Sequence, residues 1–201
     1  MLEHLHDAAL IVVDLQNDFC AGGSLEVPDG DRVVPVLNQY AARFAAAGRP
    51  VFASRDWHPP VTRHFQGHGG VWPPHCVQGT RGAEFHPDLR LPPGAQVVST
   101  GQDPNEDGYS AFPSTLEDGR GLAQALRDAG VRHVYAGGLA TDYCVKATIL
   151  DAIAAGFQAT LLLDASRGVN LQPHNAEAAI EEMVRAGART ATLAQLPAPV
   201  A

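Results

Sequence analysis

Short apolar runs alternate with longer segments of helical period along this chain. The runs are too short for helices and mostly β-branched, which predicts strands over residues 8–14, 50–56, 95–100, 133–138, 158–164 and 189–193. The intervening segments predict helices over residues 33–48, 121–130, 141–156 and 175–187, which end on Gly48, Gly130, Gly156 and Gly187. This alternation is typical of βαβ units, so we predict an α/β fold with a parallel sheet.

Size and charge narrow the class of protein. The chain has 201 residues, of which 45% are hydrophobic and 18% charged, and we expect one domain spanning residues 1–201. No apolar run approaches the roughly 20 residues that a membrane span needs. A net charge of −8 without clustered lysine and arginine argues against nucleic-acid binding and favours a small-molecule substrate.

The N-terminus and the cysteines bear on the compartment. The first residues, MLEHLHD, carry two acids and no basic cluster, which argues against a signal peptide. We therefore expect a cytoplasmic protein without a membrane partner. The three cysteines, Cys20, Cys76 and Cys144, are sparse and odd in number, so thiol or metal chemistry is favoured over a disulfide framework.

Residues 56–94 form a segment rich in proline, glycine and histidine that is too long for a passive connection, so we expect it to carry function. It holds four candidate ligands of a divalent ion such as zinc, iron or manganese: Asp56, His58, His64 and His75. The alternative is that these histidines are solvated polar groups, and we assign His68 and His86 to that ordinary role.

Chemically active residues follow several predicted strands. Asp14, Asp56 and Thr100 close the first three, and Cys144 follows the fourth after a short turn. The carboxyl ends of parallel strands meet at one edge of a sheet, where ligands bind, so we expect these residues to share a crevice. An aspartate at a strand end can also be only a turn or capping residue, although agreement across several strands disfavours that alternative.

Cys144 is the candidate nucleophile. It lies in the first turn of its predicted helix, with Thr141 or Asp142 as N-cap, and the helix dipole there is expected to lower the pKa of its thiol. The preceding turn, residues 137–140, is suited to presenting backbone N–H groups to an oxyanion. Asp14 is then a candidate for proton transfer. The alternative is a buried structural cysteine, but Cys20 and Cys76 lack such a helix start.

Five sequence motifs support a more specific interpretation. They are VVDLQNDFC (12–20), SRDWHPP (54–60), WPPHCVQGTRGAEFHP (72–87), GYSAF (108–112) and GLATDYCVKAT (138–148). In order and spacing, over almost the full length, the chain resembles the nicotinamidase (pyrazinamidase) branch of the isochorismatase-like cysteine hydrolases. The resemblance implies a three-layer α/β/α domain with a six-stranded parallel sheet. It also implies hydrolysis of nicotinamide, or a similar pyridine carboxamide, to the acid and ammonia through a thioester on Cys144.

The resemblance also implies roles for individual residues. Asp14 matches the catalytic aspartate, and the metal ligands match Asp56, His58 and His75, with His64 matching a fourth ligand seen in some members. The metal would bind the pyridine nitrogen. Residues that line the ring pocket match Phe19, Trp72 and Tyr109, and Gln16 lies beside them. The backbones of Ala140 and Cys144 would form the oxyanion hole, with a cis peptide before Ala140. Family members are often dimers or larger, which leaves a homo-oligomer open.

One departure from the family pattern affects the catalytic set. The family has a lysine nine positions before the tyrosine of its YSxF motif, and Thr100 stands there in this chain. The only lysine, Lys146, lies two residues after Cys144 and points about 200° away around the helix, so we expect it not to reach the cavity. The catalytic set is therefore Asp14, Thr100 and Cys144. Three functions stay open: an active nicotinamidase, a hydrolase of another small amide, or an impaired member that binds a pyridine ligand without turnover.

Overall fold

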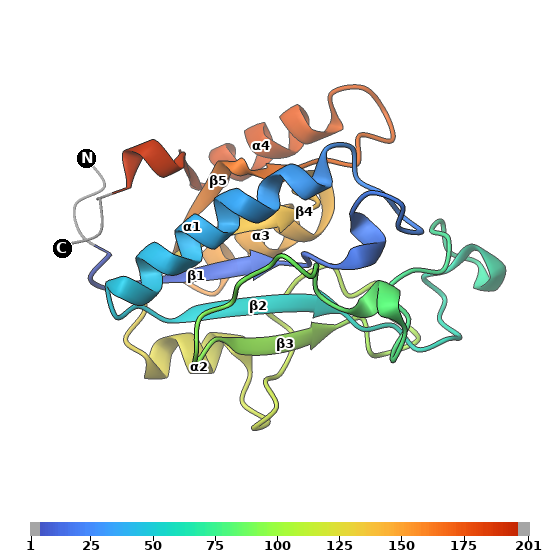
Figure 1. Cartoon of the computed structure of the whole chain (residues 1–201), viewed down its shortest axis with the longest axis horizontal. Helices are drawn as coiled ribbons and strands as arrows, with labels where there is room; N and C mark the ends of the chain where they lie inside the picture. The colour runs from blue at the N-terminus through green and yellow to red at the C-terminus, as the bar shows by residue number, and fades with distance from the viewer. Residues whose placement is uncertain (1–4, 197–201) are drawn as a thin grey trace.

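The computed structural model describes residues 5–196 as six parallel strands with helices on both faces. The first four residues, on which part of the N-terminal expectation rests, lie outside the described residues. The strands are β1 (Ala8–Val13), β2 (Val51–Asp56), β3 (Gln96–Thr100), β4 (His133–Leu139), β5 (Gln158–Arg167) and β6 (Arg189–Ala191). Their order in the sheet is β3-β2-β1-β4-β5-β6, so the predicted fold class is confirmed (Figure 1).

The apolar strands are buried on both faces. In β1 the side chains of Ala8, Leu10 and Val12 pack in one hydrophobic cluster, whereas Ala9, Ile11 and Val13 pack in the other. Because alternate side chains of a strand point to opposite faces, a continuous apolar run is what a sheet covered on both sides requires.

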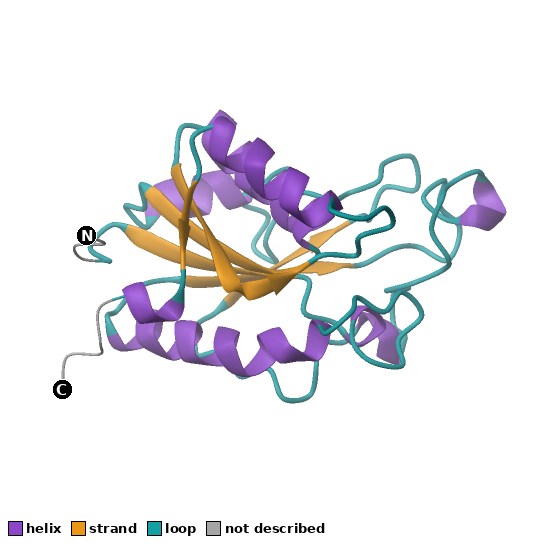
Figure 2. Ribbon diagram, turned by 90° about the horizontal axis from the view of Figure 1, so that it is seen from above, coloured by secondary structure: helices purple, strands orange, loops and turns teal. Residues whose placement is uncertain are grey.

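Four helices cover the two faces. They are α1 (Val33–Ala46), α2 (Leu122–Asp128), α3 (Lys146–Ala154) and α4 (Asn175–Arg185). Figure 2 shows α1 on one side of the sheet and the other three helices opposite. The glycine after each predicted helix has a positive φ, which confirms the four expected helix ends. Within residues 5–196 no helix is long and apolar enough to cross a membrane.

Strand ends differ from the prediction where local irregularities intervene. A register shift between Ala136 and Gly138 of β4 is accompanied by a longer β5, which runs to Arg167, three residues beyond the predicted end. Strand β6 is only three residues long. Strand β4 ends at Leu139, one residue beyond the predicted strand end at 138, so most of the predicted turn 137–140 belongs to the strand. A Cβ on Gly138 would lie 2.0 Å from the Val13 carbonyl oxygen, so only glycine fits between these strands.

The sheet order positions the site. Strand β1 lies between β2 and β4, so the chain leaves β1 toward one edge and later returns to extend the sheet toward the other. Crevices at such a reversal, outside the carboxyl ends of the strands, are where open α/β sheets bind ligands. Here the crevice lies between the residues that follow β1 and β4. The segment after β2 extends past this edge in Figure 1.

Candidate active site

Asp14 and Cys144 face each other across this reversal point. Asp14 directly follows β1 and adopts a φ of 47°, in the left-handed region that few non-glycine residues occupy. Carboxylate oxygens of Asp14 and Asp56 and the sulfur of Cys144 lie within 4.8 Å of one another. The Ser54 hydroxyl donates a 2.6 Å hydrogen bond to Oδ1 of Asp14, whereas Oδ2 has no partner among the described residues. The predicted strand-end cluster is therefore present in space.

The environment of Cys144 does not lower its pKa, so that prediction is wrong. Burial raises the pKa of the thiol well above its usual value, and the carboxylates of Asp14 and Asp56 raise it further. Burial likewise raises the pKa of Asp14, with Asp56 as the next cause. Both groups therefore hold their protons more tightly than usual, and Asp14 can act as a base toward the thiol only once it has lost its own proton.

The helix that carries Cys144 begins differently from the prediction. Its first residues, Thr141–Val145, form a π-helical turn that leads into α3, and neither Thr141 nor Asp142 caps it. The Asp142 carboxylate instead accepts hydrogen bonds from the backbone N–H groups of Val169 and Asn170, at 2.9 and 2.8 Å. Asp142 therefore joins the helix start to the loop after β5.

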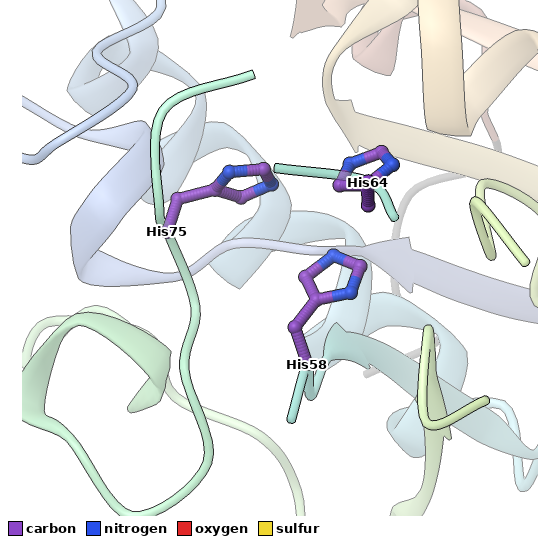
Figure 3. Close-up of side chains that lie close together, drawn as sticks. All are labelled: His58, His64 and His75. Atoms are coloured by element: carbon purple, nitrogen blue, oxygen red, sulfur yellow. The ribbon is translucent and has the colours of Figure 1, made fainter. Parts of the chain in front are cut away.

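Three histidines of the long segment converge in one buried cluster (Figure 3). The imidazoles of His58, His64 and His75 each offer a nitrogen within 4.8 Å of the other two, and all three are at most 2% exposed. Nε2 of His58 and Nε2 of His75 lie 3.4 and 3.6 Å from Oδ2 of Asp56. Burial raises the pKa of Asp56, but the neighbouring imidazoles of His58 and His75 outweigh it and lower the pKa of the carboxyl below its usual value.

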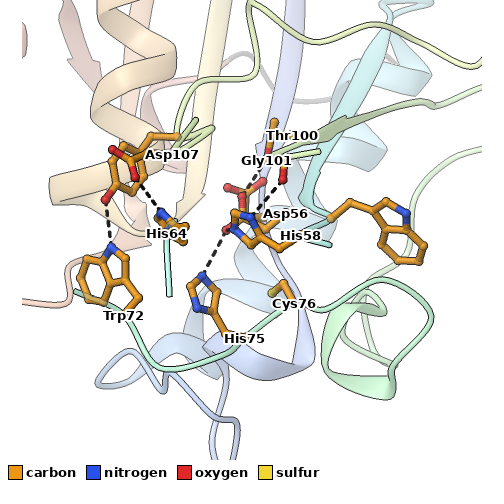
Figure 4. Close-up of polar contacts among 12 residues, drawn as sticks. Asp56, His58, His64, Trp72, His75, Cys76, Thr100, Gly101 and Asp107 are labelled. Atoms are coloured by element: carbon orange, nitrogen blue, oxygen red, sulfur yellow. Dashed lines mark hydrogen bonds and ion pairs between the residues drawn. The ribbon is translucent and has the colours of Figure 1, made fainter. Parts of the chain in front are cut away.

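Hydrogen bonds define the tautomer of each imidazole. Nδ1 of His58 lies 3.1 Å from the Gly101 carbonyl, and Nδ1 of His64 lies 3.0 Å from the Asp107 carboxylate (Figure 4). Nδ1 of His75 lies 2.8 Å from the Pro73 carbonyl. These oxygens only accept hydrogen bonds, so each Nδ1 carries the proton and each Nε2 is left with a lone pair.

This donor set fits a divalent cation. Nε2 of His58 is buried without a hydrogen-bond partner among the described residues. Burial of an unpaired polar atom costs free energy, and a bound ion would remove that cost. Three imidazole nitrogens and one carboxylate oxygen match the preferences of zinc and of neighbouring transition metals. Burial lowers the pKa of His64, which favours the neutral form that binds a metal.

A second group of residues of metal-binding type differs in the position of its imidazole proton. Cys20, Asp31 and His86 also lie within 4.8 Å of one another. Nδ1 of His86, however, accepts a 3.1 Å hydrogen bond from the backbone N–H of Asp88, so the ring proton is on Nε2, which faces Asp31 at 3.3 Å. His86 therefore has no free lone pair toward this group.

A narrow cavity of about 20 Å³ joins the thiol to the histidine cluster. Its lining includes the predicted side chains Phe19, Trp72 and Tyr109, together with residues of both clusters and Ala140. Leu25, Tyr143 and Val169 also line it and were not predicted. Tyr143 stands next to Cys144 in the GLATDYCVKAT motif and could have been found there, whereas Leu25 and Val169 carry no sequence signal. The peptide between Leu139 and Ala140 is cis, as expected.

Gln16, predicted beside the substrate, lies outside the lining. Its Nε2 donates to the carbonyls of Asp56 and Ala83 at 2.7 and 2.9 Å, and its Oε1 accepts from the Asp56 N–H at 2.8 Å. The amide is buried and fully used by backbone groups. Gln16 therefore supports the end of β2 and has no free group for a ligand.

Comparison with known proteins identifies the family. The Isochorismatase domain profile matches residues 8–195, nearly the whole chain. The chain belongs to the isochorismatase domain family. A nicotinamidase of Escherichia coli strain K12 is 43% identical over 205 residues, which cover 92% of this chain and 95% of that protein.

Solved structures of the isochorismatase family have the same fold. A pyrazinamidase of Pyrococcus horikoshii in complex with zinc matches with a TM-score of 0.85 and 44% identity, covering 93% of this chain and 99% of that one. PnC1 from L. infantum in complex with nicotinate also has a TM-score of 0.85, with 35% identity and 96% of each chain covered.

Thr100, predicted to belong to the catalytic set with Asp14 and Cys144, contacts a different group. Its hydroxyl lies 2.7 Å from Oδ1 of Asp56 and 3.2 Å from the Arg55 carbonyl, on the metal-binding side, and it does not line the cavity. Lys146, as expected, does not reach the cavity; its Nζ lies 3.1 Å from Glu182. Among residues 5–196, no lysine or arginine lines this cavity.

Proposed function

We propose that this chain is an amidohydrolase that converts nicotinamide into nicotinate and ammonia, with Cys144 as the nucleophile. The observation that carries the proposal is one cavity whose wall includes Cys144 on one side and Asp56, His64 and His75 on the other. A pyridine carboxamide has an electrophilic carbon for the sulfur and a ring nitrogen for a metal. The nicotinamidase relative and the pyrazinamidase structure with zinc support this assignment.

Asp56, His58, His64 and His75 would hold one divalent ion, and zinc, iron and manganese all accept such ligands. When bound, the ion supplies a Lewis acid for the pyridine nitrogen and so orients the ring. Phe19, Trp72, Tyr109 and Tyr143 would enclose that ring with apolar and aromatic surface.

The first half-reaction releases ammonia. Asp14 takes the proton of the Cys144 thiol while the sulfur attacks the carboxamide carbon. The oxyanion that develops faces the backbone N–H groups of Ala140 and Cys144. Asp14 then returns the proton to the amide nitrogen as the C–N bond breaks, which leaves ammonia and a thioester on Cys144.

The second half-reaction restores the thiol. Water loses a proton to Asp14 while its oxygen attacks the thioester carbon. The C–S bond then breaks, and the Cys144 sulfur recovers the proton from Asp14. The acid formed releases its remaining proton to solvent and leaves as nicotinate, and both side chains regain their starting protonation.

A ligand-binding protein without turnover is the second candidate. The observation that favours it is the absence of any lysine or arginine in the cavity lining within residues 5–196, together with the engagement of Thr100 by Asp56. Without a lysine or arginine in the lining, formation of the Cys144 thiolate relies on Asp14 as the base and on the helix start.

Ammonia release separates the candidates. The purified protein is loaded with zinc, iron or manganese, or treated with a chelator, and is supplied with nicotinamide, pyrazinamide or benzamide. The proposal predicts metal-dependent release from the first two amides and little from benzamide, which has no ring nitrogen. Equal release from benzamide, insensitive to chelation, indicates a hydrolase of other small amides. Nicotinamide binding by calorimetry without ammonia release indicates a ligand-binding protein.

A further inference from the structure

The three histidines differ in the group that accepts a hydrogen bond from their Nδ1 atoms. His58 and His75 donate from Nδ1 to backbone carbonyls. His64 instead donates to a side chain, the carboxylate of Asp107, as Figure 4 shows. A backbone carbonyl supports its histidine whatever side chain is present. The orientation of His64 therefore depends on one side chain, and that side chain is charged.

The loop that carries Asp107 packs closely against His58. A Cβ on Gly101 would lie 2.4 Å from Cε1 of His58, and a Cβ on Gly108 would lie 2.4 Å from the Cα of Gly101. Both glycines have positive φ, 64° and 72°. The two ends of the loop are thus in close backbone contact beside His58, which only glycine permits.

The same loop is bound to the segment that carries His64. The Pro104 carbonyl accepts a 2.9 Å hydrogen bond from the Arg63 N–H, and the hydroxyl of Thr62 lies 3.2 Å from the same oxygen. These contacts hold the loop next to His64. The Asp107 side chain is 47% exposed, whereas that of His64 is only 2% exposed, so the carboxylate reaches from the surface to a buried ring.

We propose that Asp107 is a positioning residue that holds His64 with its Nε2 lone pair toward the metal, and so makes His64 the fourth protein ligand. The inference rests on the proposed function only in requiring that the site binds a metal. A carboxylate that accepts from the distal nitrogen of a ligating histidine fixes the ring tautomer and orientation and increases the basicity of the ligating nitrogen. Asp107 would not touch the substrate or the ion.

An ordinary surface ion pair is the alternative, and it makes a different prediction. Such a pair would change stability slightly and leave metal affinity untouched. Removal of a residue that orients a metal ligand typically weakens metal binding by about 10- to 100-fold. Metal affinity therefore separates the two.

The experiment measures zinc affinity by competition with a chromophoric chelator. We compare the unmodified protein with Asp107→Ala, Asp107→Asn and, as a matched control on the same exposed loop, Glu106→Ala. We expect Asp107→Ala to bind zinc at least about tenfold more weakly. Asp107→Asn should recover much of the affinity, because the amide oxygen still accepts from Nδ1, and Glu106→Ala should be unchanged.

Two further measurements test whether Asp107 affects zinc affinity through His64. In a His64→Ala background, adding Asp107→Ala should cause no further loss of zinc affinity, because the residue it positions is gone. The visible spectrum of the cobalt-substituted protein should change in the same way for Asp107→Ala and His64→Ala. A general loss of folding would instead lower the Tm of the metal-free Asp107→Ala protein, which we expect to match that of Glu106→Ala.

The outcomes are distinguishable. If the unmodified protein binds zinc and Asp107→Ala binds it equally well with an unchanged cobalt spectrum, Asp107 is a surface ion-pair residue and the inference fails alone. Absence of zinc, iron or manganese binding by the unmodified protein contradicts the proposed metal site, and the inference fails with it.

Discussion

The hydroxyl of Thr100 lies 2.7 Å from Oδ1 of Asp56. It therefore supports the carboxylate whose other oxygen faces His58 and His75, and it makes no hydrogen bond with Asp14. Oδ2 of Asp14 is left without a hydrogen-bond partner among the described residues. The position that the family pattern assigns to a lysine thus contacts a proposed metal ligand here, and within residues 5–196 no lysine or arginine lines the cavity that holds the thiol.

We predict that kcat/KM for nicotinamide rises with pH along a limb that lies higher than an unperturbed carboxyl would place it. Burial raises the pKa of both Asp14 and Cys144, and neighbouring carboxylates raise them further. Below these raised values both groups are protonated and the pair has neither base nor thiolate. Loss of one proton as pH rises creates the active form, so the raised pKa values shift the rising limb to higher pH. A pH–rate profile measures it.

Thr100→Lys should move this rising limb to lower pH. A cation within about 4–6 Å of an anion lowers its pKa by about 1–3 units, so we expect roughly a tenfold or greater gain in kcat/KM at pH 7. Thr100→Ser, which keeps the hydroxyl and adds no charge, is the control and should follow the unmodified profile. Metal content is measured in all three proteins. If the lysine variant is fully loaded with metal and no faster at pH 7, the missing charge does not limit the rate.

The three thiols should differ in function. Cys20 and Cys76 are buried away from the cavity lining, and burial raises the pKa of Cys20 to about 12 and that of Cys76 well above its usual value. We expect Cys20→Ala and Cys76→Ala to keep kcat/KM within a few-fold, although the buried substitution at Cys76 costs about 1–2 kcal/mol of stability. Cys144→Ala should lose turnover and keep its metal. Inactivation by alkylation at Cys20 or Cys76 alone contradicts this assignment.

His133 should make stability depend on pH. Burial, with a smaller contribution from Arg189, lowers its pKa to about 4, and its Nε2 lies 2.8 Å from the Thr160 hydroxyl. Since the folded pKa is below the unfolded value of roughly 6.5, the contribution is full above pH 6.5 and is lost as pH falls toward 4. The loss is at most about 3 kcal/mol.

Urea unfolding at pH 7 and pH 4.5 tests this dependence. His133→Gln should lose less stability than the unmodified protein between the two pH values, because glutamine does not titrate. His68→Gln, at an exposed site, should behave as the unmodified protein does. A His133→Gln protein that loses as much stability on acidification as the unmodified one rules out His133 as a source of the acid sensitivity.

The sheet was predictable because its signal is local. A continuous apolar run such as residues 8–13 is typical of a strand covered on both faces. The gathering of Asp14, Asp56 and Cys144 followed from the parallel topology alone. The strand and helix limits moved by a few residues, since the β4 register shift and the π-helical turn depend on tertiary packing.

The remaining features depend on contacts between distant segments. The thiol pKa of Cys144 is raised first by burial and then by two carboxylates 130 and 88 positions earlier in the chain, neither of which can be inferred from the sequence of its own helix. The partner of Thr100 lies on the neighbouring strand. Asp107 resembles any acidic residue of a polar, glycine-rich loop, and only the fold reveals the buried ring that it contacts.

Trapping the acyl-enzyme tests most directly the central claim that Cys144 attacks nicotinamide. The metal-loaded protein is mixed with excess nicotinamide and quenched in acid within one turnover, and its peptides are analysed by mass spectrometry. We predict a nicotinoyl group on the peptide that contains Cys144, formed together with ammonia and absent from the Cys144→Ala protein. Ammonia and nicotinate produced at full rate by Cys144→Ala, with no adduct on any cysteine of the unmodified protein, would contradict the account.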